Sequence, residues 1–315
     1  MDLHHALGHD RATPQGLLAG TDDGAFRRTE SGWQPIGLSP AVVNDIVWMA
    51  QDHLLASVEF VVDQTPDHRL VETCDGGVRW HVVENDFGGG GGDLEAVHAL
   101  VYDIAGGRLL ATGNDVLAES RDHGRHWTLL AGAWQSFASR KDALTFDPIR
   151  GDVWYGGQDA IEGLVLVRRR QADGGLDSYP GLLPSPSASK GIRHVMGQPQ
   201  RLLVSGEGGI VQTLDDGISW QTLLADDEHR FYFDVLHDVQ RPRRFITAAW
   251  KKDFDEPQPL VLRVSDDDGV SWRRIEHPDQ GLFGGAWSMA LQIEGGRSII
   301  YLGLYRGGVM QVELV

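Results

Sequence analysis

Disulfides, membrane spans and an excess of positive charge are all missing from this sequence. It has a single cysteine, Cys74, in 315 residues, which excludes an internal disulfide framework. No apolar run reaches the ~18 residues that a membrane-spanning helix needs. With 28 basic and 45 acidic residues the net charge is −17, which argues against nucleic acid or a membrane as the main partner, because phosphate groups bind clustered Lys and Arg. The local exception, Arg168–Arg170, lies in a strand-like run and is interpreted as a solvated face.

The N-terminal ten residues lack both a basic start and an apolar core, so they do not have the form of a signal peptide. We therefore expect a cytoplasmic protein as the sequence stands, and a secreted or periplasmic one if the chain has been cut after a signal. The length and the apolar content of 41% are ample for a sizeable core.

A repeated motif, Ser/Thr-x-Asp-x-Gly-x-x-Trp, sets the period of the chain. The tryptophans of two successive copies, Trp80 and Trp127, are 47 residues apart (127 − 80), and a shortened copy ends 47 residues earlier at Trp33. A degraded copy at 171–179 has Tyr in place of Trp. A fixed period of 40 to 50 residues is typical of propellers and solenoids. The four full copies are Thr73–Trp80, Ser120–Trp127, Thr213–Trp220 and Ser265–Trp272.

The content of one period favours a propeller. Residues 97–103, 108–112, 116–120 and 127–130 read as four short antiparallel strands, with no convincing helix between them. Such a unit is a propeller blade. We predict an all-β, seven-bladed β-propeller of four-stranded antiparallel blades, forming a single domain over 1–315. The last blade is either short or completed by a strand from the N-terminus. The expected blades are 1–37, 43–85, 96–132, 141–181, 191–226, 231–277 and 286–315.

The motif resembles the Asp box, or BNR repeat, of sialidases, xyloglucan-hydrolysing enzymes, the sortilin ectodomain and a photosystem II assembly factor. The Asp can accept backbone N–H bonds across the hairpin, the Gly supplies a positive φ, and the Trp packs between strands. The resemblance implies that these boxes lie on the face opposite the ligand site, and Cys74, inside one of them, is interpreted as incidental. The residues assigned to this structural role are Asp75, Trp80, Asp122, Trp127, Asp215, Trp220, Asp267 and Trp272.

The expected inner strands carry polar residues at one equivalent position. Aligning these strands places His5, His98 and Asp142 together, with Asp45 and Arg193 if shorter turns are allowed, and with His194 one residue away. In a propeller they would ring the mouth of the central channel. His5, His98 and His194 could bind a divalent metal there with carboxylates. Alternatively, they simply line a wet channel mouth.

Loops that enter the inner strands, and loops that join second and third strands, would form the rest of the ligand site. They combine carboxylates, which glycoside hydrolysis needs in pairs, with aromatics that can stack on sugar rings. No Arg-Ile-Pro motif is present, so sialidase activity is not expected. The predicted catalytic residues are Asp45, Asp142, Glu207, Tyr305 and Arg306, and the predicted substrate-binding residues are Trp134, Arg193, Trp250, Lys251 and Trp287.

Two functions follow from this interpretation. The first is a glycoside hydrolase-like or lyase-like enzyme that acts on a carbohydrate or other small polar substrate and could use a metal. The second is a non-catalytic protein-binding or assembly propeller. The sequence favours the first slightly, because of the acidic loops and their tryptophans.

Overall fold

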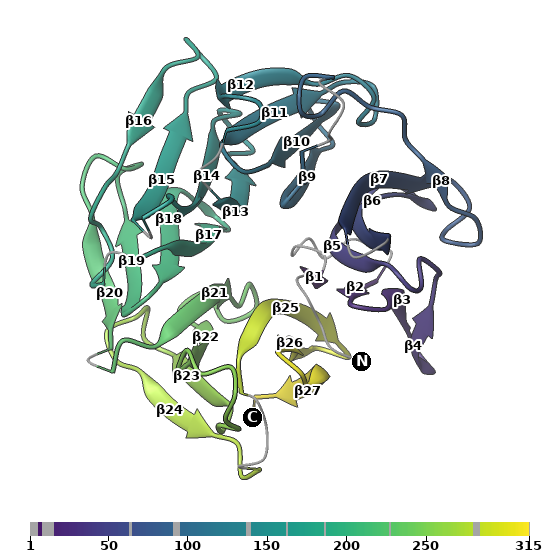
Figure 1. Cartoon of the computed structure of the whole chain (residues 1–315). Helices are drawn as coiled ribbons and strands as arrows, with labels where there is room; N and C mark the ends of the chain where they lie inside the picture. Colours follow the sequence, from purple (N-terminus) through teal and green to yellow (C-terminus); the bar gives the residue numbers. More distant parts are fainter. Residues whose placement is uncertain are drawn as a thin grey trace. The chain divides into compact units, whose positions relative to one another are not determined.

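A computed structural model describes residues 6–7, 16–62, 65–90, 95–136, 140–161, 163–185, 187–226, 228–279 and 284–314. Within these ranges every regular element is a β-strand, 27 in all, and none is a helix that could cross a membrane. The chain divides into two compact units, Met1–Leu144 and Thr145–Val315. Each unit is a row of antiparallel sheets that follow one another in chain order (Figure 1).

The first unit contains three four-stranded sheets, each made of four consecutive strands. Neighbouring sheets contact one another through β5, the first strand of the second sheet, which lies against β2 of the first sheet and β9 of the third. The strands are β1 (Ala6–Leu7), β2 (Leu18–Thr21), β3 (Gly24–Thr29), β4 (Gly32–Pro35), β5 (Val42–Ala50), β6 (His53–Val62), β7 (Thr65–Thr73), β8 (His81–Val82), β9 (Ala99–Asp103), β10 (Arg108–Thr112), β11 (Val116–Ser120) and β12 (Thr128–Gly132).

The second unit contains the remaining sheets, three of four strands and a last one of three, and the boundary between the units falls inside β13. The strands are β13 (Arg140–Phe146), β14 (Val153–Gln158), β15 (Leu164–Arg169), β16 (Leu176–Ser178), β17 (Ser189–Val195), β18 (Gln198–Gly206), β19 (Gly209–Thr213), β20 (Gln221–Ala225), β21 (Phe231–His237), β22 (Phe245–Trp250), β23 (Val261–Ser265), β24 (Arg273–Glu276), β25 (Ala286–Glu294), β26 (Arg297–Leu304) and β27 (Gly308–Glu313).

Burial follows the position of a strand within its sheet. The second strands β10 and β22 are buried along their whole length, because a neighbouring sheet covers one or both of their faces. The fourth strand β24 is mostly exposed. Apolar cores therefore lie between successive sheets, such as the one in which Leu55 and Leu70 of the second sheet pack on Leu100 and Leu109 of the third. This pattern explains the continuous apolar runs of the second strands.

Seven antiparallel sheets in chain order confirm the predicted all-β, seven-bladed β-propeller fold. The seventh sheet has three strands in the part of the chain that the structure describes, and Ala6–Leu7 pairs with β2 of the first sheet. The alternative, a last blade completed by a strand from the N-terminus, falls largely on residues outside the described ranges and stays a prediction.

The four motif copies form the turns between the third and fourth strands of their sheets, with the same hydrogen bonds in each. In the third copy, Thr213 Oγ1 donates to Asp215 Oδ1 at 2.8 Å and accepts from the N–H of Gly217 at 2.7 Å. Asp215 Oδ1 also accepts the N–H of Ser219 at 2.8 Å. In the first copy, the corresponding N–H of Arg79, helped by its side chain, lowers the pKa of Asp75 to about 2. The carboxylates are thus bound within their own turns, as predicted.

The motif tryptophans and glycines connect successive sheets. Trp80 Nε1 donates to the carbonyl of Ile36 in the preceding sheet at 2.6 Å, and Trp272 Nε1 donates to that of Leu223 at 3.1 Å. Gly217 has a φ of 85°, and an added Cβ would lie 2.8 Å from Tyr179 Oη. Only glycine therefore fits between this turn and the fourth sheet.

Replacing Thr213 by Val should lower the free energy of unfolding by about 1–3 kcal/mol, because the buried N–H of Gly217 loses its acceptor. The matched control is Thr222→Val on the exposed outer strand β20, which should change stability by less than about 0.5 kcal/mol. Urea titration compares the two variants. Equal stability of both would contradict a structural role for the motif hydroxyl.

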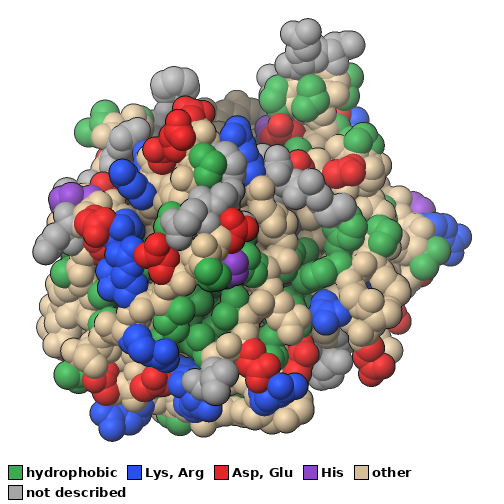
Figure 2. All heavy atoms as spheres, turned by 90° about the horizontal axis from the view of Figure 1, so that it is seen from below, with side chains coloured by type: hydrophobic (Ala, Val, Ile, Leu, Met, Phe, Trp, Pro, Cys, Tyr) green, Lys and Arg blue, Asp and Glu red, His purple; other side chains and the backbone are tan. Residues whose placement is uncertain are grey.

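The basic run Arg168–Arg170 departs from its predicted solvated face. Arg168 is largely buried, donates to Asp152 Oδ2 and Asp216 Oδ2, and lies over the ring of Trp154. Burial of a charge requires such pairing, since an isolated guanidinium would lose its hydration without compensation. On the surface, Lys/Arg and Asp/Glu side chains lie interspersed over the face shown in Figure 2.

Candidate functional site

Six aromatic side chains of the second unit gather at the ends of the sheets opposite the motif turns. They come from the starts of β21 and β25, the end of β22, and the loops that follow β22 and β26. These are the ligand-site loops expected from the sequence. We call them the aromatic cluster: Phe231, Phe233, Trp250, Phe254, Trp287 and Tyr305.

The rings of the aromatic cluster pack mainly on one another. Trp287 stacks on Tyr305 with centroids 4.9 Å apart and on Phe233 at 5.7 Å. Trp250 lies beneath them, only 2% exposed, and meets Trp287 edge to face at 5.9 Å. Phe254 is 40% exposed and packs its ring on Trp250 at 5.0 Å. The cluster therefore presents a compact apolar surface rather than free flat ring faces.

Three cations lie over rings of the aromatic cluster. The Arg306 guanidinium is 5.0 Å from the Tyr305 centroid, and Lys252 Nζ is 5.2 Å from that of Phe231. Lys190 Nζ lies 6.0 Å from the Phe233 ring. Each distance is within the ~6 Å range of a cation–π interaction. Lysine and arginine side chains thus border this apolar surface, together with the carboxylates of Asp253, Asp255 and Glu256 in the loop that carries Phe254.

Two aspartates of the inner strands accept hydrogen bonds from their own strand's backbone and from a neighbouring sheet. Asp45 is 4% exposed and accepts the N–H of Ile46 at 2.8 Å and the N–H of Leu100, in the next sheet, at 2.7 Å. Asp234 accepts the N–H of Val235 at 2.8 Å and Arg193 Nε at 2.9 Å. Asp45 and Arg193, predicted to be catalytic and substrate-binding, are therefore held in contacts between sheets.

His98 and Asp142 lie near each other in the first unit. Burial lowers the pKa of His98, and the Asp142 charge opposes that effect. His98 Nε2 is 3.0 Å from Asn114 Oδ1. His194 lies in the second unit, and His5 lies outside the described residues. The metal-binding role of the three histidines remains a prediction.

Burial lowers the pKa of His194 to about 4, and its Nε2 has no hydrogen-bond partner among the described residues. The folded state then binds its proton only below about pH 4, whereas an unfolded histidine binds one near pH 6.5. Stability should therefore fall by on the order of 2–3 kcal/mol as the pH drops from 6.5 to 4. His194→Gln should flatten this part of the stability–pH curve in urea titrations. An unchanged slope would show that other groups cause it.

The structure brings five of the ten predicted catalytic and substrate-binding residues to the aromatic cluster. Glu207 forms a backbone bridge with Phe231 and so lies beside the cluster. Trp134, by contrast, packs edge to face on Phe87 in the first unit, at 5.0 Å. Sequence reasoning missed Phe231, Phe233 and Phe254, although all three lie at the strand ends where the other members were found. The five residues at the cluster are Trp250, Lys251, Trp287, Tyr305 and Arg306.

Comparison with known proteins shows a shared fold. No family model and no curated protein sequence matches the chain. Among solved structures, YCF48 bound to D1 peptide matches with a TM-score of 0.64 at 15% identity, over 100% of this chain and 96% of that one. The GH74 xyloglucanase of Xanthomonas campestris matches with a TM-score of 0.63 at 16% identity.

The matched structures differ in the share of their own length that this chain covers. The match covers 98% of this chain but 51% of the xyloglucanase, so the chain spans about half of that enzyme's length. A chain of the Mitotic Checkpoint Complex also matches, with a TM-score of 0.67 at 11% identity, over 95% of this chain and 87% of that one. Enzymes and proteins in complex with partners therefore share this propeller fold, which by itself does not decide the function.

Proposed function

We propose that this protein is a non-catalytic binding propeller, and that its aromatic cluster binds a peptide segment of a partner protein with apolar and acidic residues. The observation that carries this proposal is the compact apolar surface with three cations over its rings. Apolar side chains of the bound peptide can pack against Phe254 and Tyr305, while carboxylates of the peptide can pair with Lys190, Lys252 and Arg306. Aromatic side chains and arginines are also the residues that dominate binding energy in protein interfaces.

The ring geometry favours a peptide over a glycan. A sugar stacks on an exposed flat ring, but Trp287 is stacked on both Phe233 and Tyr305, and Trp250 is buried. The exposed ring of Phe254 and the ring edges suit aliphatic or aromatic side chains better. YCF48 bound to D1 peptide, which matches almost end to end, supports the same choice.

A phage-displayed peptide library and a glycan array, screened with the full chain, test this proposal. We expect enrichment of peptides that combine Asp or Glu with aromatic or aliphatic residues. Binding of a selected peptide should weaken with added salt, because exposed charges are screened. Binding only to glycans, or only to peptides without acidic residues, would contradict the proposal.

A hydrolase is the second candidate, favoured by the GH74 neighbour and by Glu207 beside the cluster. A glycosidase needs two carboxyl groups about 5–10 Å apart. Of the carboxylates predicted to be catalytic, Asp45 binds backbone amides. Turnover of an aryl glycoside that is lost in Glu207→Gln would establish this candidate instead.

A further inference from the structure

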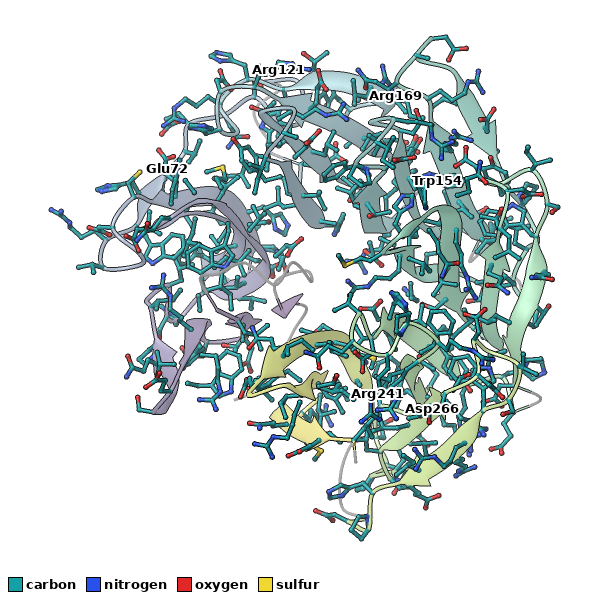
Figure 3. All side chains as sticks on the ribbon, turned by 180° about the vertical axis from the view of Figure 1, so that it is seen from behind. Glu72, Arg121, Trp154, Arg169, Arg241 and Asp266 are labelled. Carbon is teal, nitrogen blue, oxygen red and sulfur yellow. The ribbon has the colours of Figure 1, made fainter. Side chains whose placement is uncertain are left out.

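The motif-turn end of the first unit gathers a histidine, a glutamate and the only thiol of the chain. Ligand atoms of His53, Glu72 and Cys74 all lie within 4.8 Å of one another. His53 begins β6, Glu72 is the penultimate residue of β7, and Cys74 follows in the motif turn. Figure 3 shows Glu72 in this sheet. We call these three residues the thiol cluster.

We propose that the thiol cluster is a binding site for a borderline-soft divalent cation such as Zn²⁺. Thiolate, imidazole and carboxylate are the ligands that Zn²⁺ takes in proteins. Tetrahedral bonds of ordinary length would place the ligand atoms about 3.3–3.6 Å apart. His53 Nε2 and Glu72 Oε2 are already 3.4 Å apart. Cys74 is exposed, so rotation of its side chain can bring the sulfur to the same distance.

The surroundings of the thiol cluster fix its two inner ligands. The side chains of His53 and Glu72 are 16% and 15% exposed, so both are held in place. Arg125 donates to Glu72 Oε1 and leaves Oε2 directed at His53. Such an outer partner orients a ligand and tunes its affinity. The proposal therefore gives Cys74 a role as a metal ligand, in place of its interpretation from the sequence as incidental.

A four-coordinate ion would need one ligand more than the thiol cluster supplies. The ring of His123, in the motif turn of the next sheet, meets the His53 ring edge to face with centroids 5.0 Å apart. A water molecule can complete four-coordination, and His123 could do so only if its side chain rotates toward the other ligands. Cys74 would bind as a thiolate and release its proton to solvent, so affinity should rise with pH.

Thiol labelling tests the site directly, because Cys74 is the only cysteine. The metal-stripped full chain is reacted with a chromogenic disulfide reagent, with and without Zn²⁺. With free Zn²⁺ at about ten times the dissociation constant, labelling should slow about tenfold by mass action. Co²⁺ should give a thiolate-to-cobalt charge-transfer band that Cys74→Ser abolishes.

Two variants separate a cluster site from a lone reactive thiol. His53→Ala keeps the thiol but should lose the protection by Zn²⁺, as should Glu72→Gln. His68→Ala is the matched control, because His68 lies on β7 of the same sheet, opposite Glu59 and outside the thiol cluster. It should keep the protection. Absence of protection in the unmodified chain, or equal protection in His53→Ala, would overturn the proposal.

Discussion

Replacing Phe254 by Ser and Tyr305 by Ala together should weaken binding of a selected peptide by about 30-fold or more. This corresponds to at least ~2 kcal/mol, the loss typical of a dominant interface residue. Phe254 is the exposed member of the aromatic cluster, Tyr305 is half-buried, and their rings meet edge to face at 5.6 Å. Trp250 would lose two ring contacts but keep those with Phe233 and Trp287, and circular dichroism checks that the fold survives. Fluorescence polarisation of a labelled peptide measures the change in affinity.

The matched control for this variant is Ile161→Ser. Ile161 is 87% exposed in the loop after β14, which corresponds to the loop that carries Phe254. It lies in the same unit but not in the aromatic cluster, so its replacement should change peptide affinity by less than about twofold. Equal losses in both variants would mean that general surface hydrophobicity, and not the aromatic cluster, binds the peptide.

The sequence predicted the strands well where the repeat and the apolar pattern agreed. The second and third strands expected in one period, 108–112 and 116–120, are those observed as β10 and β11. The motif explains this success, because each copy marks the same turn through bonds within a few residues. Burial of second strands by neighbouring sheets then makes their apolar runs continuous.

The polar residues of the inner strands were harder to place. Counting along a strand assumes that side chains alternate between its faces, but a bulge shifts that alternation by one residue. The pairing of β5 with β6 shifts between Val43 and Asp45, and that of β21 with β22 shifts between Tyr232 and Val235. Asp45 and Asp234 both lie at such shifts. Their contacts with the next sheet follow from geometry that residue spacing does not encode.

The thiol cluster was missed for a different reason. His53 begins β6, while Glu72 and Cys74 lie about twenty residues later at the end of β7 and just after it, so no short spacing pattern connects all three. Their proximity depends on the pairing of β6 with β7, in which Leu55 lies opposite Glu72 and Leu54 opposite Thr73. That register becomes visible only once the hairpin is formed.

Replacing Asp234 by Ala should lower the free energy of unfolding by about 3 kcal/mol or more. The carboxylate accepts Arg193 Nε and the backbone N–H of Val235, and Arg193 also donates to the carbonyl of Met289. These bonds connect β17, β21 and β25, the first strands of three successive sheets. Without Asp234, a largely buried guanidinium loses its carboxylate partner. Thermal unfolding and urea titration both measure the loss.

A double-mutant cycle then separates the ion pair from its surroundings. Arg193→Met removes the charge that Asp234→Ala leaves behind, so the double variant should be more stable than Asp234→Ala alone. The coupling energy should lie between about 0.5 and 3 kcal/mol, as for contacting residues. If Arg193 were instead a ligand-binding residue, Arg193→Met would lose peptide or substrate binding at unchanged stability. The ion pair with Asp234 predicts the opposite pattern, a loss of stability with binding unchanged. The reason is that Nε and Nη2 of Arg193 already donate to the Asp234 carboxylate.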